Sequence, residues 1–343
     1  MSKGKMIISS LQSRYIVRSL KVDEYEKWDN FVDESPQGTV FHKSYWLKAS
    51  GKRFKIYGCF KGGNLVAGFP IVSRLRFGIK CGVHPYLTPY LGILFKENKT
   101  KYISRMSEEK NMSRVIAKKI KEDFGKINFS FSPLIVDLQP FIWEGFSSSV
   151  KYTYLLNLTD LEKVWEDMGD SRRNDIRRAE KDKISIELSD NFEKTFALVE
   201  KTFQRQKIKP TFRADALTYN EVLKHRKQCQ AFLSKDKKGD NIAVVYIVWD
   251  SKRSYYLLGG YDPKKRHHGV SALAMWEAIK FTKERLGLNE FDFEGSMIQP
   301  VEQYFRKFGG KLTPYYSVAW IKPFLKVILS LKKMVGSSLR KLR

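Results

Sequence analysis

The sequence predicts a mixed α+β (α/β) protein of two tandem domains, each with a mixed, largely antiparallel sheet flanked by helices. Three observations carry this prediction. The chain has 343 residues, which is long for a single hydrophobic core. Runs with strand-like alternation are separated by stretches in which apolar residues recur at helical spacing. The order of these elements in the first half returns in the second half, which indicates a duplication.

The duplication rests on positions that recur between the two halves. The glycine turn at 61–66 resembles the segment at 238–243. Five residues then recur at one constant offset: Gly125 with Gly287, Phe129 with Phe291, Phe131 with Phe293, Phe146 with Phe308, and Tyr154 with Tyr316. Such a constant offset indicates a tandem repeat. We therefore expect four segments: a flexible N-terminus at 1–14, domains at 15–160 and 161–322, and a tail at 323–343.

The composition points to an anionic partner. The formal net charge is +26, which favours nucleic acid, an anionic membrane surface or phosphorylated substrates without choosing among them. The three cysteines, Cys59, Cys81 and Cys229, are scattered, so we expect neither a disulfide framework nor a cysteine metal site. The first ten residues lack the apolar core of a secretory signal, and no stretch reaches membrane-spanning length. We expect a cytoplasmic protein.

The elements of the first half follow from turns and periodicity. Glycines between two alternating runs predict a β-hairpin, and prolines within a third run predict an edge strand. The expected elements are a strand at 15–18, a helix at 22–32, the hairpin at 55–60 and 65–73, the edge strand at 85–92, a basic helix at 107–124 and a strand at 127–131.

The second half contains the segment on which a functional prediction rests. Its expected elements are an apolar strand at 255–261, a basic loop at 264–271, a helix from Ala272 to about Leu286 and a returning strand at 291–295. The first amides of a helix are unpaired and its dipole is positive there, while Gly269 lets the backbone approach a phosphate. We expect a phosphate-bearing acyl donor at this loop.

The first half has no counterpart of this loop, since 95–99 reads Phe-Lys-Glu-Asn-Lys without a glycine. This difference suggests that the second domain holds the donor and the first helps to bind the acceptor. The alternative is that the first copy only buttresses the second.

These residues resemble the GNAT acyltransferase superfamily. The features are the R-x-x-G-x-S loop from Arg266 to Ser271 and the segment 304–310 after the returning strand. The duplication, the helix at 172–181 and the FDFEGS strand resemble a narrower branch that contains the Fem-type peptidoglycan bridge aminoacyltransferases. The resemblance implies donor-binding residues in the strand and the loop: Leu258, Gly259, Gly260, Arg266, His267, His268, Gly269, Val270 and Ser271.

Two residues depart from the family pattern. Ser271 replaces a small glycine or alanine, which a helix N-terminus tolerates. Phe305 occupies the place where many GNAT enzymes keep a tyrosine that protonates the leaving thiolate, with Tyr304 one position earlier. Either Tyr304 acts as the acid, or the leaving group needs none, as would suit an aminoacyl ester on tRNA.

Acyl transfer to an amine requires a base and an oxyanion site. Alternation places Asp292 and Glu294 on one face of the returning strand, where burial of a carboxylate pair could raise one pKa towards neutrality. We predict these two residues and Tyr304 as catalytic. The alternative is that the carboxylates bind backbone amides or an arginine, and His267 and His268 could serve as N–H donors or face solvent.

The resemblance also implies substrate-binding residues. These are Tyr90, Arg213, Arg306 and Lys307, although an exposed basic face would equally explain Arg306 and Lys307. In the helix at 172–181, arginines 173 and 177 share a face, which suits phosphate or, alternatively, an acid-balanced solvated surface. His42 and His84 lack metal-ligand spacing, so we expect no metal.

The tail places Phe324, Ile328 and Leu331 on one helical face and lysines and arginines on the other. This pattern suits an anionic membrane, which would place the protein on the inner face of the cell membrane, or alternatively a helix packed on the domain.

The sequence predicts an N-acyltransferase that uses acyl-CoA and an amine on a lipid-linked or phosphorylated cell-envelope or polysaccharide precursor. The charge and Phe305 support a second hypothesis, a Fem-type aminoacyltransferase that uses aminoacyl-tRNA. A third is a non-catalytic membrane or nucleic-acid adaptor with the same fold.

Overall fold

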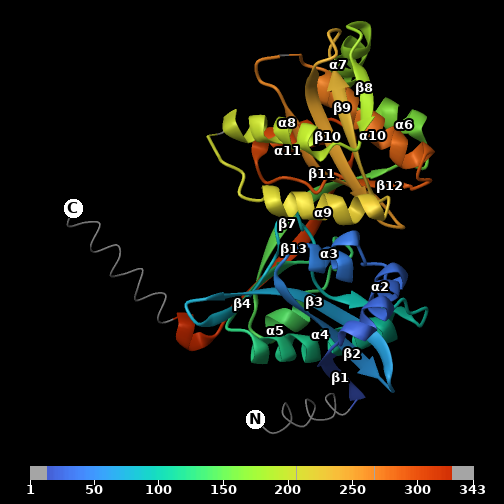
Figure 1. Ribbon diagram of the computed structural model, residues 1–343. Helices are drawn as coiled ribbons and strands as arrows, with labels where there is room; N and C mark the ends of the chain where they lie inside the picture. Colours follow the sequence, from blue (N-terminus) through green and yellow to red (C-terminus); the bar gives the residue numbers. More distant parts are fainter. Residues whose placement is uncertain (1–13, 206, 266, 327–343) are drawn as a thin grey trace, which may run out of the picture. The chain divides into compact units, whose positions relative to one another are not determined.

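The computed structural model describes residues 14–205, 207–265 and 267–326, which form two compact units (Figure 1). Within these residues, unit 1 comprises 14–48, 52–150 and 315–326, and unit 2 comprises 49–51 and 151–314. Arg266 and the segments 1–13 and 327–343 lie outside the described residues, so the predictions for that arginine, the N-terminus and most of the tail stay predictions.

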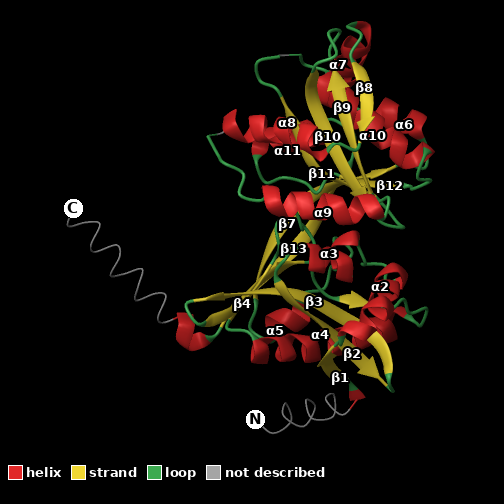
Figure 2. Ribbon diagram, in the orientation of Figure 1, coloured by secondary structure: helices red, strands yellow, loops and turns green. Residues whose placement is uncertain are grey.

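Unit 1 contains a sheet covered by helices on both faces (Figure 2). Its strands are β1 (Ile16–Ser19), β2 (Arg53–Lys61), β3 (Asn64–Arg76), β4 (Ile79–Val83), β5 (Leu94–Phe95), β6 (Lys126–Ser130) and the end of β13 (Lys311–Ile321). Its helices are η1 (Val22–Glu24), α2 (Tyr25–Glu34), η2 (Val40–His42), α3 (Ser44–Ala49), α4 (Tyr102–Asp123) and α5 (Gln139–Trp143). The sheet order is β1-β2-β3-β4-β6-β13, and β5 pairs with β3.

Side-chain alternation in β2 divides the core of unit 1. Tyr57 and Cys59 face α4 and α5, while Ile56 and Phe60 face α2. Strand residues of period two therefore supply both faces of one sheet, and each face is buried under its own helices.

Unit 2 repeats this plan. Its strands are β8 (Ser185–Ser189), β9 (Cys229–Lys235), β10 (Asn241–Trp249), β11 (Ser254–Tyr261), β12 (Glu290–Asp292) and most of β7 (Ser147–Asn157). Its helices are α6 (Leu161–Asp167), α7 (Asp170–Lys181), α8 (Phe192–Arg205), α9 (Arg213–His225), α10 (Val270–Glu284) and α11 (Gln299–Arg306). The sheet order is β8-β9-β10-β11-β12-β7.

The two copies exchange their last strands. β7 follows α5 in the chain, yet it pairs with β12 in unit 2; β13 follows α11, yet it pairs with β6 in unit 1. The expected domains at 15–160 and 161–322 keep each last strand with its own copy, so the compact units differ from them. The equivalence of Tyr154 and Tyr316 is unaffected, since these residues lie on β7 and β13.

Several element boundaries differ from the prediction for local reasons. α10 begins at Val270, two residues before the expected start, because Gly269 already serves as its N-cap. The returning strand ends at Asp292, because Glu294 and Gly295 have positive φ angles of 54° and 63°. In the described part of the chain no helix has the length and apolar character needed to cross a membrane.

Candidate active site

The candidate site of unit 2 lies where two parallel strands separate. β11 and β12 pair only at Ser254 with Phe291 and at Tyr255 with Asp292. β11 continues for six further residues, while β12 has ended and Glu294 turns the chain at positive φ. From Tyr256 onward β11 therefore has no neighbouring strand on this edge among the described residues, and backbone amides there can bind a ligand.

The backbone amides of Gly259 and Tyr261 point toward this edge. The N–H of Asp262 donates to Ile242 O on β10, whereas the N–H of Tyr261 donates to Thr202 Oγ1 on α8. Because successive amides of a strand point to opposite edges, the N–H of Gly259 shares the direction of Tyr261. Leu258 and Gly260 instead direct their amides to β10, so of these three predicted donor-binding residues Gly259 alone has its amide at the open edge.

Glu294 has the environment expected of a base. Its Oε1 is buried and has no hydrogen-bond partner within the described residues. Burial, followed by repulsion from Asp292, raises the pKa of this carboxyl well above its ordinary value. A carboxylate with a raised pKa is a stronger base than an ordinary one, and an oxygen without a hydrogen-bond partner among the described residues is available to accept a proton from an amine.

Asp292 is fully buried and hydrogen-bonded. Its Oδ1 accepts bonds from Thr153 Oγ1 at 2.6 Å and from the N–H of Glu294 at 2.8 Å. This contact with a backbone amide matches the alternative considered for the carboxylate pair. The aspartate thus fixes the turn that carries Glu294 and supplies a charge that raises the glutamate's pKa.

Aromatic residues surround this carboxyl pair. The hydroxyl of Tyr256 lies over the Cα of Gly259, where an added Cβ would be only 1.9 Å away. The Tyr256 ring also packs edge-on against Phe305, with centroids 5.3 Å apart. Burial raises the pKa of Tyr256, and Glu294 contributes to this shift. The sequence analysis did not single out Tyr256, because its position beside Glu294 depends on packing over Gly259.

The Tyr304 hydroxyl donates to Ser271 O in the first turn of α10, at 2.9 Å. Burial raises the pKa of Tyr304 to about 12, so the phenol is protonated at neutral pH. Its proton is directed at a backbone carbonyl. To act as a catalytic acid, Tyr304 would have to give up this hydrogen bond and donate to the leaving group instead.

Gly269 is held against protein backbone. A Cβ at this position would lie 2.0 Å from the carbonyl oxygen of Asp175 and 2.9 Å from Cβ of Ala179, both on α7. The glycine therefore permits the close approach of α7. The N-cap of α10 is Gly269, which has no side chain that could accept a hydrogen bond. The first amides of a helix, here those of Val270, Ser271 and Ala272, have no intrahelical acceptor.

His267 ties the loop to the same helix. Its Nδ1 accepts the N–H of Gly269 at 3.1 Å, and its Nε2 contacts Asp182 Oδ2 at 2.9 Å, just after α7. A ring nitrogen that accepts leaves the other to donate, which assigns the proton to Nε2. His268 is exposed.

Arg172 is the buried anchor of α7. Its guanidinium stacks over the rings of Tyr304 and Phe308, 4.3 and 4.7 Å from their centroids. It also donates to Tyr304 O and pairs with Asp175, both at 3.2 Å. The arginines expected to bind phosphate have other contacts, since Arg173 pairs with Asp170 and Arg177 lies over Trp165.

The predicted substrate-binding residues lie in different settings. Arg213 lies over Phe196 and pairs with Glu200 and Glu193 on α8; the hydrogen bond to Glu200, with a contribution from Glu193, raises the pKa of Arg213. The other three are Tyr90, fully buried in unit 1 against Phe41 and Tyr315; Arg306, exposed and 3.4 Å from Glu302; and Lys307, exposed.

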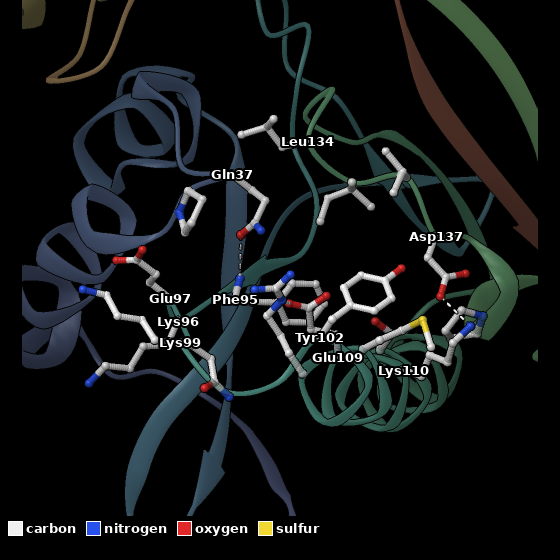
Figure 3. Close-up of a pocket in the computed structure, with 18 residues that line it drawn as sticks. Gln37, Phe95, Lys96, Glu97, Lys99, Tyr102, Glu109, Lys110, Leu134 and Asp137 are labelled. Atoms are coloured by element: carbon white, nitrogen blue, oxygen red, sulfur yellow. Dashed lines mark hydrogen bonds and ion pairs between the residues drawn. The ribbon is translucent and has the colours of Figure 1, made fainter.

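Unit 1 contains a cavity of about 450 Å³ at the equivalent place in its own copy (Figure 3). It lies between the end of β5, the first turns of α4 and the segment after β6. In the repeat, these elements correspond to those around the α10 loop of unit 2. Lys96 and Lys99 lie at one end, and the Lys110–Asp137 ion pair of 2.6 Å lies at the other. Burial, chiefly, raises the pKa of Glu109 in its wall.

The described residues contain no cluster of His, Cys, Asp and Glu that could hold a metal ion.

Comparison with known proteins places the fold. Residues 170–306, which contain α7, the β11–β12 junction and α11, match the family model described as Acetyltransferase (GNAT) domain. Unit 2 contains a GNAT domain. The match begins at the helix that carries Arg172 and ends at Arg306, so it includes the carboxylates and the glycine loop. Over the whole chain, the two units have the tandem fold of FemX and of a tandem GNAT protein.

Three solved structures share the tandem architecture. The crystal structure of FemX aligns with a TM-score of 0.71 at 13% identity, covering 92% of this chain and 99% of FemX. The C-terminal domain of a putative lysylphosphatidylglycerol synthetase from Agrobacterium fabrum gives 0.59 at 12% identity, covering 90% and 94%. A tandem GNAT protein from the clavulanic acid biosynthesis pathway gives 0.51 at 10% identity, covering 89% and 97%. No curated protein matches the chain in sequence.

Proposed function

We propose that the protein transfers an acyl or aminoacyl group to an amine of a cell-envelope or polysaccharide precursor, with Glu294 as general base. The observation that carries this proposal is the buried Glu294 Oε1 near the open edge of β11, an atom to which no described residue forms a hydrogen bond. The base removes a proton from the amine as its nitrogen attacks the acyl carbon. The N–H of Gly259 stabilises the developing oxyanion, and the donor's thiol or ribose oxygen leaves.

The proposed acceptor class follows from charge and from the relatives. FemX and the lysylphosphatidylglycerol synthetase domain share the fold, and the latter's name describes a product made from an amino acid and a membrane lipid. The net charge of +26 suits a phosphorylated or lipid-linked acceptor. The cationic end of the unit 1 cavity, formed by Lys96, Lys99 and Arg105, offers such an acceptor a binding place.

Different observations support each of the two candidate acyl donors. The family model and the Arg266–Ser271 loop favour acyl-CoA, whose diphosphate would contact the amides of Val270 to Ala272. The packing of α7 on Gly269 favours the second donor, aminoacyl-tRNA, because the glycine already contacts protein. The engaged Tyr304 hydroxyl also favours a leaving group that needs no acid.

Calorimetric titration of the full chain with acetyl-CoA separates the donors. Saturable binding that weakens in Arg266→Ala, together with a loss of at least tenfold in rate for Tyr304→Phe, supports acyl-CoA. Absence of heat with acetyl-CoA, combined with transfer from a charged tRNA, supports the second donor. If neither acetyl-CoA nor a charged tRNA supports transfer to amine-bearing, phosphorylated acceptors, the proposed function is wrong.

A further inference from the structure

The hairpin formed by β3 and β4 in unit 1 ends in an unusual turn. Its register pairs Arg76 with Ile79, so Phe77 and Gly78 form a two-residue turn. Their φ angles are 51° and 73°, both in the left-handed region. Such turns favour Asn-Gly, because the Cβ of a bulky residue approaches the carbonyl oxygen in this conformation. A phenylalanine here is locally unfavourable, which indicates that the ring serves something other than the turn.

The turn exposes its apolar side chains to solvent. Phe77 is 84% exposed and Leu75, two residues before it, is 74% exposed. Residues two apart in a strand project from the same face of the sheet, and Leu75 lies opposite Lys80 in the register. The tip of the hairpin is thus an apolar projection that the core of unit 1 does not bury.

Cationic side chains surround this projection. Arg74 and Arg76 are exposed, and the guanidinium of Arg76 lies 5.6 Å from the centre of the Phe77 ring. Neither arginine has a carboxylate within 4 Å among the described residues. The carboxylates at the end of α4, Glu122 and Asp123, are paired with Lys119, and Asp123 also with Lys55. The tip therefore presents positive charge that carboxylates leave unneutralised.

The end of the described chain lies beside the turn end of the same hairpin, next to Ile79 and Lys80. The N–H of Gly125 donates to Lys80 O, and its carbonyl accepts from Lys322, both at 2.9 Å. An added Cβ on Gly125 would contact Ile79 at 2.6 Å and Leu325 at 3.2 Å, so both side chains meet there. Phe324 is 61% exposed. The following residues, 327–343, contain five lysines and arginines and no acidic residue.

We propose that the β3–β4 tip, together with Phe324, docks unit 1 onto an anionic lipid bilayer. Phe77 and Leu75 enter the boundary between headgroups and acyl chains, and Arg74 and Arg76 bind lipid phosphates. Apolar side chains beside flexible cations suit a fluid anionic interface. This inference goes beyond the proposed transferase activity and does not depend on it.

Sedimentation of the full chain with vesicles tests the surface. Vesicles of pure phosphatidylcholine are compared with vesicles that contain about one third phosphatidylglycerol. The wild type should bind the anionic vesicles far more strongly. Phe77→Asn should lower this binding about tenfold, because Asn suits the left-handed turn but does not partition into lipid. Arg74→Glu should lower it about fivefold or more.

Ile103→Asn is the matched control, since Ile103 is 60% exposed on α4, away from the hairpin; its binding should equal that of the wild type. Thermal melting should show that Phe77→Asn remains folded. A Phe77→Trp variant should shift its emission to the blue when anionic vesicles are added. Wild-type binding by folded Phe77→Asn, equal binding to both vesicle types, or no shift with Phe77→Trp would overturn the proposal.

Discussion

Replacing Glu294 by glutamine should make unit 2 more stable at pH 8 while it removes activity. A buried polar atom without a partner costs about 1–3 kcal/mol, and more when it is charged. Glu294 Oε1 is such an atom, next to the buried Asp292. Glutamine keeps the shape but carries no charge. The free energy of unfolding at pH 8 should therefore rise by about 1–3 kcal/mol.

The sign of this effect depends on pH. The folded state raises the pKa of Glu294 above the ordinary value of 4.5. Its stabilising contribution is therefore complete below pH 4.5 and is lost as pH rises through the folded pKa. Since glutamine does not titrate, the variant and the wild type should differ least at the lowest pH at which both fold, and most at pH 8.

Urea unfolding followed by circular dichroism at pH 5 and pH 8 measures the difference. Glu302→Gln is the control, because Glu302 accepts a 2.5 Å bond from Tyr154 and contacts Arg306, so its loss should not stabilise the fold. General-base catalysis contributes about 10²–10⁴ to rates, and Glu294→Gln should lose a factor in that range. A stability difference that is equal at both pH values, or a variant that keeps the wild-type rate, would refute the reasoning.

Three further predictions concern contacts around the sites. Gly269→Ala should lower the free energy of unfolding by about 1–3 kcal/mol, because the added Cβ would overlap a carbonyl of α7. Gly169→Ala is the control: the nearest atom to its added Cβ is 3.6 Å away, so the same urea assay should show a change of less than about 0.5 kcal/mol. Arg172→Met should cost about 3 kcal/mol by removing a buried, hydrogen-bonded guanidinium; a thermal melt within 2 °C of the wild type would contradict this. Lys96→Glu combined with Lys99→Glu should raise KM for a phosphorylated acceptor about tenfold and leave kcat within about twofold, and a fall in kcat at unchanged KM would argue against acceptor binding in the unit 1 cavity.

The sequence predicted the tandem plan and its mixed sheets, because turn residues and alternation are local signals. The constant offset between Phe129 and Phe291 also identified equivalent strands, β6 and β12. The exchange of β7 and β13 was not predictable in this way. Strand partners depend on contacts far apart in the chain, and the repeat itself is the same whether the last strands are exchanged or not.

The carboxylate pair was located from sequence, but the difference between its members was not. Alternation placed Asp292 and Glu294 together, and the resemblance indicated acyl transfer. The hydrogen bonds of Asp292 to Thr153 and to the N–H of Glu294 depend on the neighbouring strand and on a turn with positive φ. Such tertiary contacts decide which carboxylate is satisfied and which one can accept a proton.

The contact made by Gly269 also differs from the predicted one. A glycine at the start of a helix predicts a phosphate site, since small size permits close approach. The observed close approach is that of the α7 backbone at Asp175. Sequence spacing shows that something lies near the glycine, but it does not show whether that is a ligand or another helix.

The most direct measurement of the central claim is an NMR titration of the full chain with ¹³C-labelled glutamate carboxyl groups, recorded for the wild type and for Glu294→Gln. One carboxyl signal of the wild type should titrate clearly above the ordinary range of glutamate, and this signal should be missing in the variant. If every signal absent from the variant titrates near pH 4.5, Glu294 is an ordinary carboxylate and the general-base assignment is wrong.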